Sequence, residues 1–176
     1  MNKQTIVIAV LLASLVTIPS SDAFLTQLGD GDYLSHLVIN FSDGGIYEFD
    51  VRYSDLMWTG KDLLDFVEQS TDLETVQNEF EFGGGPVFFL DGISFDGRSN
   101  SGFGGGDDWW RYWIRDGETG EWESPAFGFS DRTISDGSWD GWVYGSANPP
   151  VLIPEPGTAW LLAGGMMLLG WMRRRG

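Results

Sequence analysis

The stretch from residue 36 to residue 53 alternates between apolar and polar side chains on both sides of a short turn, and this constrains the fold most. Successive side chains of a β-strand point to opposite faces, so a period of two predicts strands with one buried face. Asp43-Gly44-Gly45 supplies residues suited to a tight turn between them. The segment therefore predicts a β-hairpin. Its buried face would carry Leu37, Ile39, Phe41, Tyr47, Phe49, Val51 and Tyr53.

The period changes to that of a helix in residues 59–70. Thr59 is a good N-cap residue, and Asp62 stands three positions later, where its carboxylate can complete a capping box. The apolar residues Leu63, Leu64, Phe66 and Val67 follow at helical spacing. We expect one short helix that lies across the sheet.

Several later segments predict further strands. Residues 86–93 are apolar enough for a compact buried strand, and Trp122 is expected to lie across a turn at residues 116–120 from the preceding strand, in a second hairpin. The fold class is therefore α+β, with one small β-rich domain of antiparallel hairpins and one short helix packed on the sheet. The predicted strands are residues 76–82, 86–93, 109–114 and, as a short last strand, 142–144.

The charge of the body excludes one class of partner. Residues 24–153 contain 24 acidic and six basic residues, a net charge of −18. Phosphate backbones bind clustered Lys and Arg, so nucleic acid is excluded as a partner. The chain has no cysteine and 15% aromatic residues, so its stability comes from an aromatic core without disulfides. The lone His36 has no second His or Cys beside it, so neither a metal site nor a cofactor is expected.

Residues 1–23 have the order of a secretory signal peptide. Lys3 supplies the positive head, and an apolar run from Ile6 to Val16 follows, shorter than the roughly 20 residues that span a bilayer. A small-x-small site ends at Ala23, so signal peptidase is expected to cut between Ala23 and Phe24 after export by the general secretion machinery.

The other end of the chain predicts a membrane anchor. Residues 158–172 carry no charge, and Arg173, Arg174 and Arg175 follow at once. Clustered arginines beside an apolar helix stay on the cytoplasmic side, so the acidic body is expected on the outer side of the inner membrane. The predicted divisions are a signal peptide (1–23), an exported β-rich domain (24–146), a linker (147–157), and a transmembrane helix with an arginine-rich tail (158–176).

The tripeptide Pro154-Glu155-Pro156, the apolar helix and the arginine cluster together resemble the PEP-CTERM sorting signal of Gram-negative, exopolysaccharide-producing bacteria. The resemblance covers the last 24 residues of the chain. It implies that an exosortase, a membrane protease-transpeptidase, recognises Pro154, Glu155 and Pro156 while the arginines hold the substrate in place. It further implies a transient inner-membrane anchor with the domain facing the periplasm, followed by delivery to the cell surface or the medium. An ordinary tail anchor is the alternative.

The body has a second resemblance, which spans residues 37–144. The strings "TGKDLLDFVE", "GGPVFFLDGI", "WWRYWIRDGETGEW" and "DGSWDGWVY" are similar to the small β-rich C-terminal domain of transcobalamin and intrinsic factor. Asp116-Gly117 stands where that family has an Asn-Gly turn. The resemblance implies a surface module that binds a cobamide or another small ligand, although this chain has no helical partner domain.

The tryptophans suggest a binding surface. Six lie between Trp109 and Trp142, too many for one face of a small core, so we expect Trp109, Trp113 and Trp139 to include rings that stack on sugars or on another protein. Asp107 and Asp108 suit a polysaccharide hydrolase by residue type, but neighbours in a strand point to opposite faces. The sequence thus predicts a non-enzymatic surface or matrix protein with a binding or structural role in exopolysaccharide or biofilm. A hydrolase and a cobamide-binding module are the alternatives.

Overall fold

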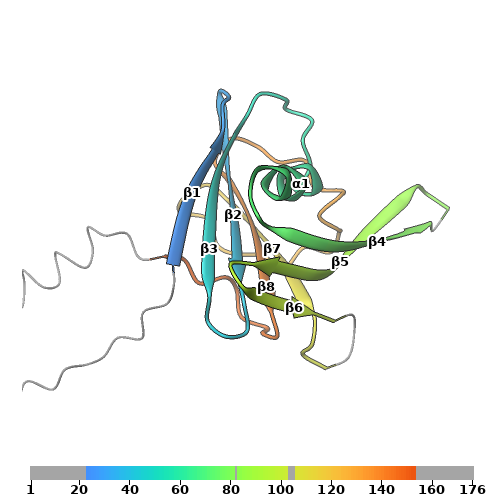
Figure 1. Ribbon diagram of the computed structural model, residues 1–176. Coiled ribbons are helices and arrows are strands. Elements are labelled where there is room, and N and C mark those ends of the chain that lie inside the picture. Colours follow the sequence, from blue (N-terminus) through green and yellow to red (C-terminus); the bar gives the residue numbers. More distant parts are fainter. Residues whose placement is uncertain (1–22, 82, 103–105, 154–176) are drawn as a thin grey trace, which may run out of the picture.

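The predicted hairpin forms the centre of a five-stranded sheet in the computed structural model, which describes residues 23–81, 83–102 and 106–153 (Figure 1). Strands β2 (Tyr33–Asn40) and β3 (Ile46–Tyr53) pair antiparallel, with Leu37 opposite Phe49. Both of these side chains are fully buried. The hairpin and its buried face are confirmed.

The five-stranded sheet has the order β1-β3-β2-β8-β7. Strand β8 lies in its interior, parallel to β2 and antiparallel to β7, and it is buried from Ser138 to Val143. The short last strand predicted at 142–144 is present but starts four residues earlier than predicted, because pairing with a strand about a hundred residues away leaves no local period. The three further strands are β1 (Ala23–Gly29), β7 (Trp110–Asp116) and β8 (Ser138–Tyr144).

The second predicted hairpin is confirmed only in part: its first strand is β7, but the segment after the turn pairs with that strand at a single position. Strand β7 pairs with β8, and the segment that contains Trp122 contributes one isolated bridge, Ile114 to Glu123. The indole of Trp122 instead packs on Gly141 of β8, where a Cβ atom would come within 3.1 Å of the ring.

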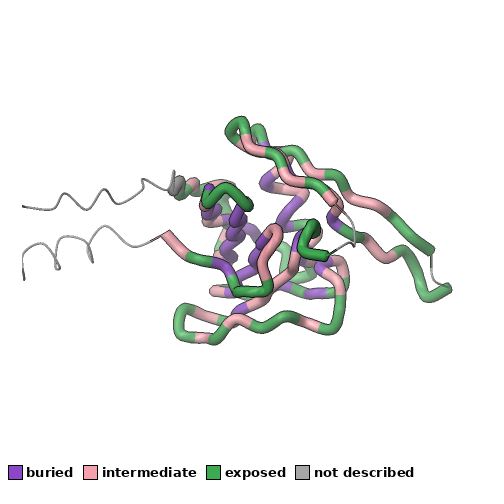
Figure 2. The backbone as a smooth tube through the Cα atoms, turned by 90° about the horizontal axis from the view of Figure 1, so that it is seen from below, coloured by how far each residue is buried: buried purple, intermediate pink, exposed green. Residues whose placement is uncertain are grey.

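A second sheet of three strands has the order β4-β5-β6, with antiparallel pairing throughout. The strands predicted at 76–82 and 86–93 correspond to β4, which ends at Glu81 in the described residues, and to β5. Strand β5 is not fully buried: Leu90 and Ile93 face the core, whereas Phe89 is 36% exposed. The β4–β5 hairpin extends away from the body (Figures 1 and 2), so one part of β5 has no sheet to cover it. The strands are β4 (Glu74–Glu81), β5 (Pro86–Phe95) and β6 (Arg98–Ser101).

Helix α1 (Gly60–Ser70) and the three-stranded sheet cover the same face of the five-stranded sheet (Figure 1), and the core lies between them. The capping box is confirmed: the Asp62 amide donates to Thr59 Oγ1 over 3.2 Å, and the Thr59 amide donates to Asp62 Oδ2 over 2.8 Å. Leu63, Leu64 and Val67 are fully buried. The prediction of one short helix on the sheet is thus correct.

The ends of the described chain lie side by side at one edge of the domain in Figures 1 and 2. Ala23 begins β1, and Ile153 itself contacts β3 through a hydrogen bond to Glu48. Residues 1–22 of the predicted signal peptide, the Pro154-Glu155-Pro156 tripeptide and the predicted transmembrane helix lie outside the described residues. Within the described ranges, no helix has the length and apolar character needed to cross a membrane.

Candidate functional site

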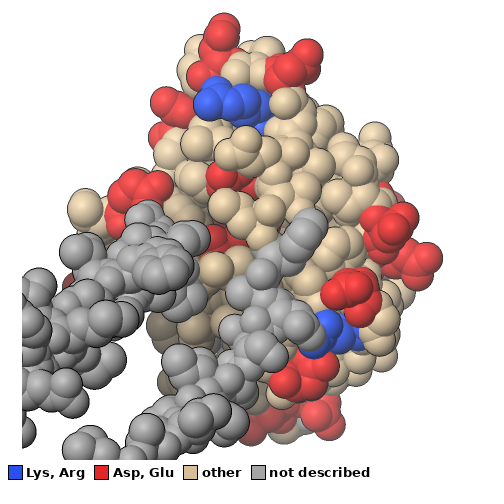
Figure 3. All heavy atoms as spheres, turned by 60° about the vertical axis from the view of Figure 1, so that its left-hand side comes forward, with Lys and Arg blue, Asp and Glu red and all other residues tan. Residues whose placement is uncertain are grey.

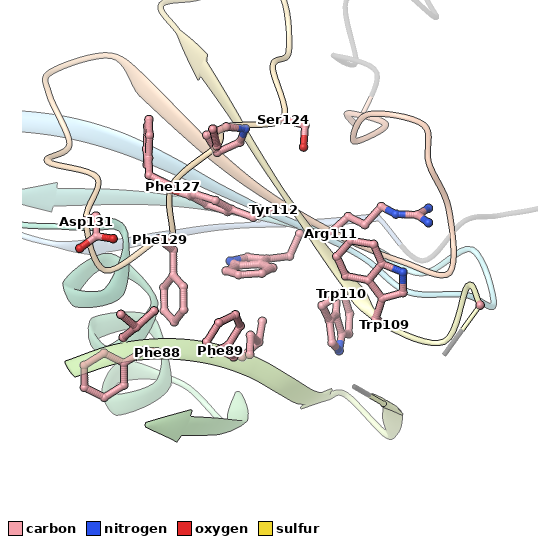
Figure 4. A pocket seen from close by; sticks show the side chains of 17 residues that line it. Phe88, Phe89, Trp109, Trp110, Arg111, Tyr112, Ser124, Phe127, Phe129 and Asp131 are labelled. Atoms are coloured by element: carbon pink, nitrogen blue, oxygen red, sulfur yellow. The ribbon is translucent and has the colours of Figure 1, made fainter. Parts of the chain in front are cut away.

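A cavity of about 920 Å³ opens where the two sheets diverge, between β5, β7 and the loop of residues 124–131 (Figure 4). Eight of its 17 lining residues are aromatic. They include Phe88, Phe89, Trp109, Trp110, Phe127 and Phe129.

The rings differ in exposure between the mouth and the floor of the cavity. Trp109 is 38% exposed and Phe127 46% exposed, and both stand at the mouth with Phe89. Trp110 and Phe129 are buried at 3% and 2% exposure and form the floor. A ligand can therefore meet aromatic faces that are already held in place, which lowers the entropy cost of binding.

Two charged residues lie at the cavity. The Arg111 guanidinium stands 4.7 Å from the centre of the Trp109 ring and 3.2 Å from a carboxylate oxygen of Asp107. This arrangement orients the Trp109 indole through a cation–π contact and leaves Arg111 with a partner for its charge. Asp131 is the one carboxylate among the lining residues that the structure describes.

A buried ionic cluster supports the cavity wall from behind. The hydroxyl of Tyr112, which lines the cavity, donates to Oδ1 of Asp140, and Arg132 Nε lies 3.3 Å from Oδ2 of the same carboxylate. Arg132 also reaches Asp116 over 3.1 Å. Burial raises the pKa of Asp140 to about 6 against the opposing effect of Arg132. Burial, and then the negative charge of Asp140, raise the pKa of Tyr112 above its ordinary value.

Backbone hydrogen bonds attach the same wall to the start of α1. The amides of Gly60 and Lys61 donate to the carbonyls of Arg132 and Phe129 over 2.9 and 3.2 Å. The first amides of a helix have no partner within it, so these bonds satisfy groups that would otherwise need water. They also hold Phe129 in the floor. The cavity is therefore built on a fixed part of the fold.

The structure separates the three tryptophans that the sequence singled out. Trp109 lies at the mouth of the cavity, whereas Trp113 and Trp139 belong to the outer face of the five-stranded sheet, away from it. Trp139 is 6% exposed, stacked on His36 at 3.9 Å and covered by the Arg115 guanidinium at 4.1 Å. The expectation that Trp139 offers a ring to a ligand is therefore corrected: both its faces are already occupied.

The other singled-out polar residues have local partners. His36 Nδ1 lies 2.7 Å from Asp50 Oδ1 in a buried contact, which gives the histidine a structural role. Asp107 pairs with Arg111, and neither Asp107 nor Asp108 lines the cavity. In the part of the chain that the structure describes, no three His, Asp or Glu side chains gather as a metal site would require.

The phenylalanines of the cavity were not anticipated from the sequence. Phe88 and Phe89 lie in the strand predicted to be buried, and Phe127 and Phe129 lie in a segment without a clear period. Their spacing, adjacent in one segment and two apart in the other, was the available signal. Four phenylalanines in two short segments flanking the tryptophan-rich strand indicate more aromatic surface than the core can cover.

No protein family, no curated protein and no solved structure matches this chain.

Proposed function

We propose that this chain is an exported, non-enzymatic surface or matrix protein that binds a neutral polysaccharide through its aromatic cavity. The observation that carries the proposal is the row of exposed rings at the cavity mouth, above all Trp109 and Phe127. Sugar rings have apolar C–H faces, and these stack on aromatic side chains that water does not solvate well. A cavity of about 920 Å³ has room for a few sugar units.

The charge of the domain favours a neutral polymer. Residues 24–153 carry 24 acidic and six basic residues. On the face that Figure 3 shows, acidic side chains are scattered and outnumber the basic ones. An acidic polysaccharide would be repelled by this field, and Arg111, the basic residue at the cavity, already has Asp107 as a partner.

The two ends of the sequence support delivery to the surface. A signal peptide followed by cleavage after Ala23, and an exosortase acting at Pro154-Glu155-Pro156, would take the domain through the inner membrane to the periplasm and then to the cell surface or the medium.

The alternatives differ in what the cavity must supply. A glycoside hydrolase needs two carboxyl groups on either side of the scissile bond, and among the described lining residues Asp131 is the single carboxylate. A cobamide-binding module is the second candidate, because the cavity is large and mostly apolar. A calorimetric titration with both kinds of ligand distinguishes a cobamide-binding module from a polysaccharide binder.

The binding proposal is tested by calorimetric titration of the full chain in detergent micelles. The ligands are a neutral oligosaccharide series, an acidic series and a cobamide. We expect heat from the neutral series, and at least a tenfold weaker affinity in Trp109→Ala and in Phe127→Ala. Leu56→Ala is the control, because Leu56 is also exposed, at 53%, but does not line the cavity. Unchanged affinity in both aromatic variants, or binding of the cobamide alone, would overturn the proposal.

The sorting proposal has a separate test. The protein is recovered from the envelope and medium of a host with an active exosortase, and its intact mass is measured. We expect loss of the arginine-rich tail. A product that still ends in Arg175-Gly176 would refute the sorting step and leave the binding result unaffected.

A further inference from the structure

The segment of residues 150–153 does not behave as a free linker. It crosses the outer face of the five-stranded sheet, opposite the face that carries α1, and touches three neighbouring strands in four residues. Pro150 is buried over β8, Val151 is bound at β2, and Ile153 is bound at β3. We call these four residues the strap.

Asn40, the last residue of β2, forms the first attachment of the strap. Its side-chain Nδ2 donates to the Val151 carbonyl over 3.1 Å, and its Oδ1 accepts from the Val151 amide over 2.6 Å. One side chain thus satisfies both backbone polar groups of Val151, as a neighbouring strand would. Asn40 is only 8% exposed, so water competes poorly for these bonds.

Glu48 of β3 forms the second attachment, because its Oε1 accepts from the Ile153 amide over 2.5 Å. A third contact is steric. A Cβ atom on Gly141 would come within 2.4 Å of Pro150 Cγ, so this glycine provides the space into which the proline ring fits. The strap is therefore held at both ends, by a polar contact at Ile153 and by packing at Pro150.

The next residue after the strap is Pro154, the first of the tripeptide. We propose that the strap is an intramolecular lock on sorting, in which Asn40 and Glu48 compete with the exosortase for the backbone that precedes Pro154. The inference rests on the proposed sorting step and adds a mechanism that regulates its rate. Processing enzymes bind an extended backbone around the scissile bond. An amide hydrogen bonded to Asn40 or Glu48 is not free to donate to such an enzyme.

The lock has a kinetic consequence. When a segment opens and closes quickly compared with cleavage, the rate of cleavage follows the fraction of molecules in which the segment is open. Weakening the strap raises this fraction without touching the tripeptide or the apolar anchor. The domain thereby slows its own release until an enzyme with enough affinity captures the open form.

The test follows cleavage of the full chain in membranes with exosortase in excess, by pulse–chase and intact mass. Asn40→Ala removes both bonds to Val151, and Gly141→Ala displaces Pro150 from the other end without changing a polar group. Asn100→Ala is the matched control, since Asn100 also accepts a backbone hydrogen bond, from the Ser42 amide over 3.0 Å in the β2–β3 turn, and not from the strap. Amide hydrogen exchange of Val151 and Ile153 on the full chain in micelles reports the strap directly.

We expect both strap variants to be cut at least fivefold faster than the wild type and to exchange the two amides faster, while Asn100→Ala behaves as the wild type. Wild-type rates in both strap variants would overturn the lock even though sorting holds. If the wild-type chain is never cut, the sorting proposal fails and the lock fails with it. Fast exchange of the Val151 and Ile153 amides in the wild type would show that the strap is not held on the sheet, and the lock would then be refuted. A circular-dichroism melt of each variant identifies any that has lost the fold. If one of the two strap variants has lost it, the other variant alone tests the lock.

Discussion

Tyr112 donates a hydrogen bond to Asp140 inside the domain, where the carboxylate is 1% exposed. Burial raises the pKa of Asp140 from 3.8 to about 6. The folded protein therefore binds this proton more tightly than the unfolded chain does, and Asp140 favours the folded state most below about pH 4. That contribution is lost as the pH rises from about 4 through 6. We expect the free energy of unfolding to fall over this interval by up to about 3 kcal/mol on account of Asp140.

Urea titrations between pH 4 and pH 7 measure this dependence. Asp140→Asn is expected to flatten it, because the amide does not titrate. Asp72→Asn is the control, since Asp72 lies exposed between α1 and β4. An equal slope in the wild type and in Asp140→Asn would show that the carboxylate titrates alike in the folded and unfolded chains.

Removal of the Tyr112 hydroxyl separates the stability of the cavity wall from its binding surface. Tyr112→Phe leaves the ring in place but takes a donor away from the buried Asp140 carboxylate. An unsatisfied buried acceptor costs about 1–3 kcal/mol, so the free energy of unfolding should fall by that amount at pH 7. Oligosaccharide affinity should change less than threefold, because Trp109 and Phe127 keep their exposed faces. A large loss of affinity at full stability would instead place the hydroxyl in the binding site.

Local patterns in the sequence predicted the elements whose partners are near in the chain. The β2–β3 hairpin has its two strands five residues apart, and its alternation shows directly which face is buried. The helix is likewise specified by Thr59, Asp62 and the spacing of its leucines, all within one segment. Each of these two predictions depended on a regular spacing of apolar residues and on a residue that marks the end of the element, and the sequence contains both.

The placement of β8 and the cavity could not be predicted in this way. Parallel pairing of His36 with Trp139 joins residues about a hundred positions apart, and no local period encodes it. The cavity depends on how far β5 and β7 diverge, which is set by the packing of rings from four separate segments. Trp139 was expected at the surface because its neighbours are turn residues. It is buried because the strand that begins there enters the sheet between two others.

Loss of the helix cap should cost stability without affecting the cavity. Thr59→Ala removes the hydroxyl that accepts from the Asp62 amide over 3.2 Å. Such a change typically costs about 1 kcal/mol. Thr59→Ser keeps the hydroxyl and is expected to stay within a few tenths of a kcal/mol of the wild type. Urea unfolding measures both, and a destabilised serine variant would indicate that the methyl group, not the cap, contributes the stability.

Gly60 is the tightest point between α1 and the buried ionic cluster. A Cβ atom there would lie 2.7 Å from the Tyr112 hydroxyl, 2.8 Å from Asp140 Oδ1 and 2.9 Å from the Phe129 carbonyl. Alanine is the better helix former by about 1 kcal/mol, but crowding of this kind costs about 1–3 kcal/mol. One of the three neighbours is a backbone atom that cannot rotate away, so crowding prevails and Gly60→Ala should lower the free energy of unfolding.

The matched control is Gly84→Ala in the β4–β5 turn, where a Cβ atom would meet nothing within 4 Å. It should be neutral or slightly stabilising, since alanine restricts the unfolded chain more than glycine does. Urea unfolding of both variants decides the matter. Because Gly60 donates to the Arg132 carbonyl and so holds the cavity wall, Gly60→Ala should also weaken oligosaccharide binding, whereas Gly84→Ala should not. A Gly60→Ala variant as stable as the wild type would mean that α1 shifts away from Tyr112 and Asp140 at little cost, and the rigid wall inferred for the cavity would then be wrong.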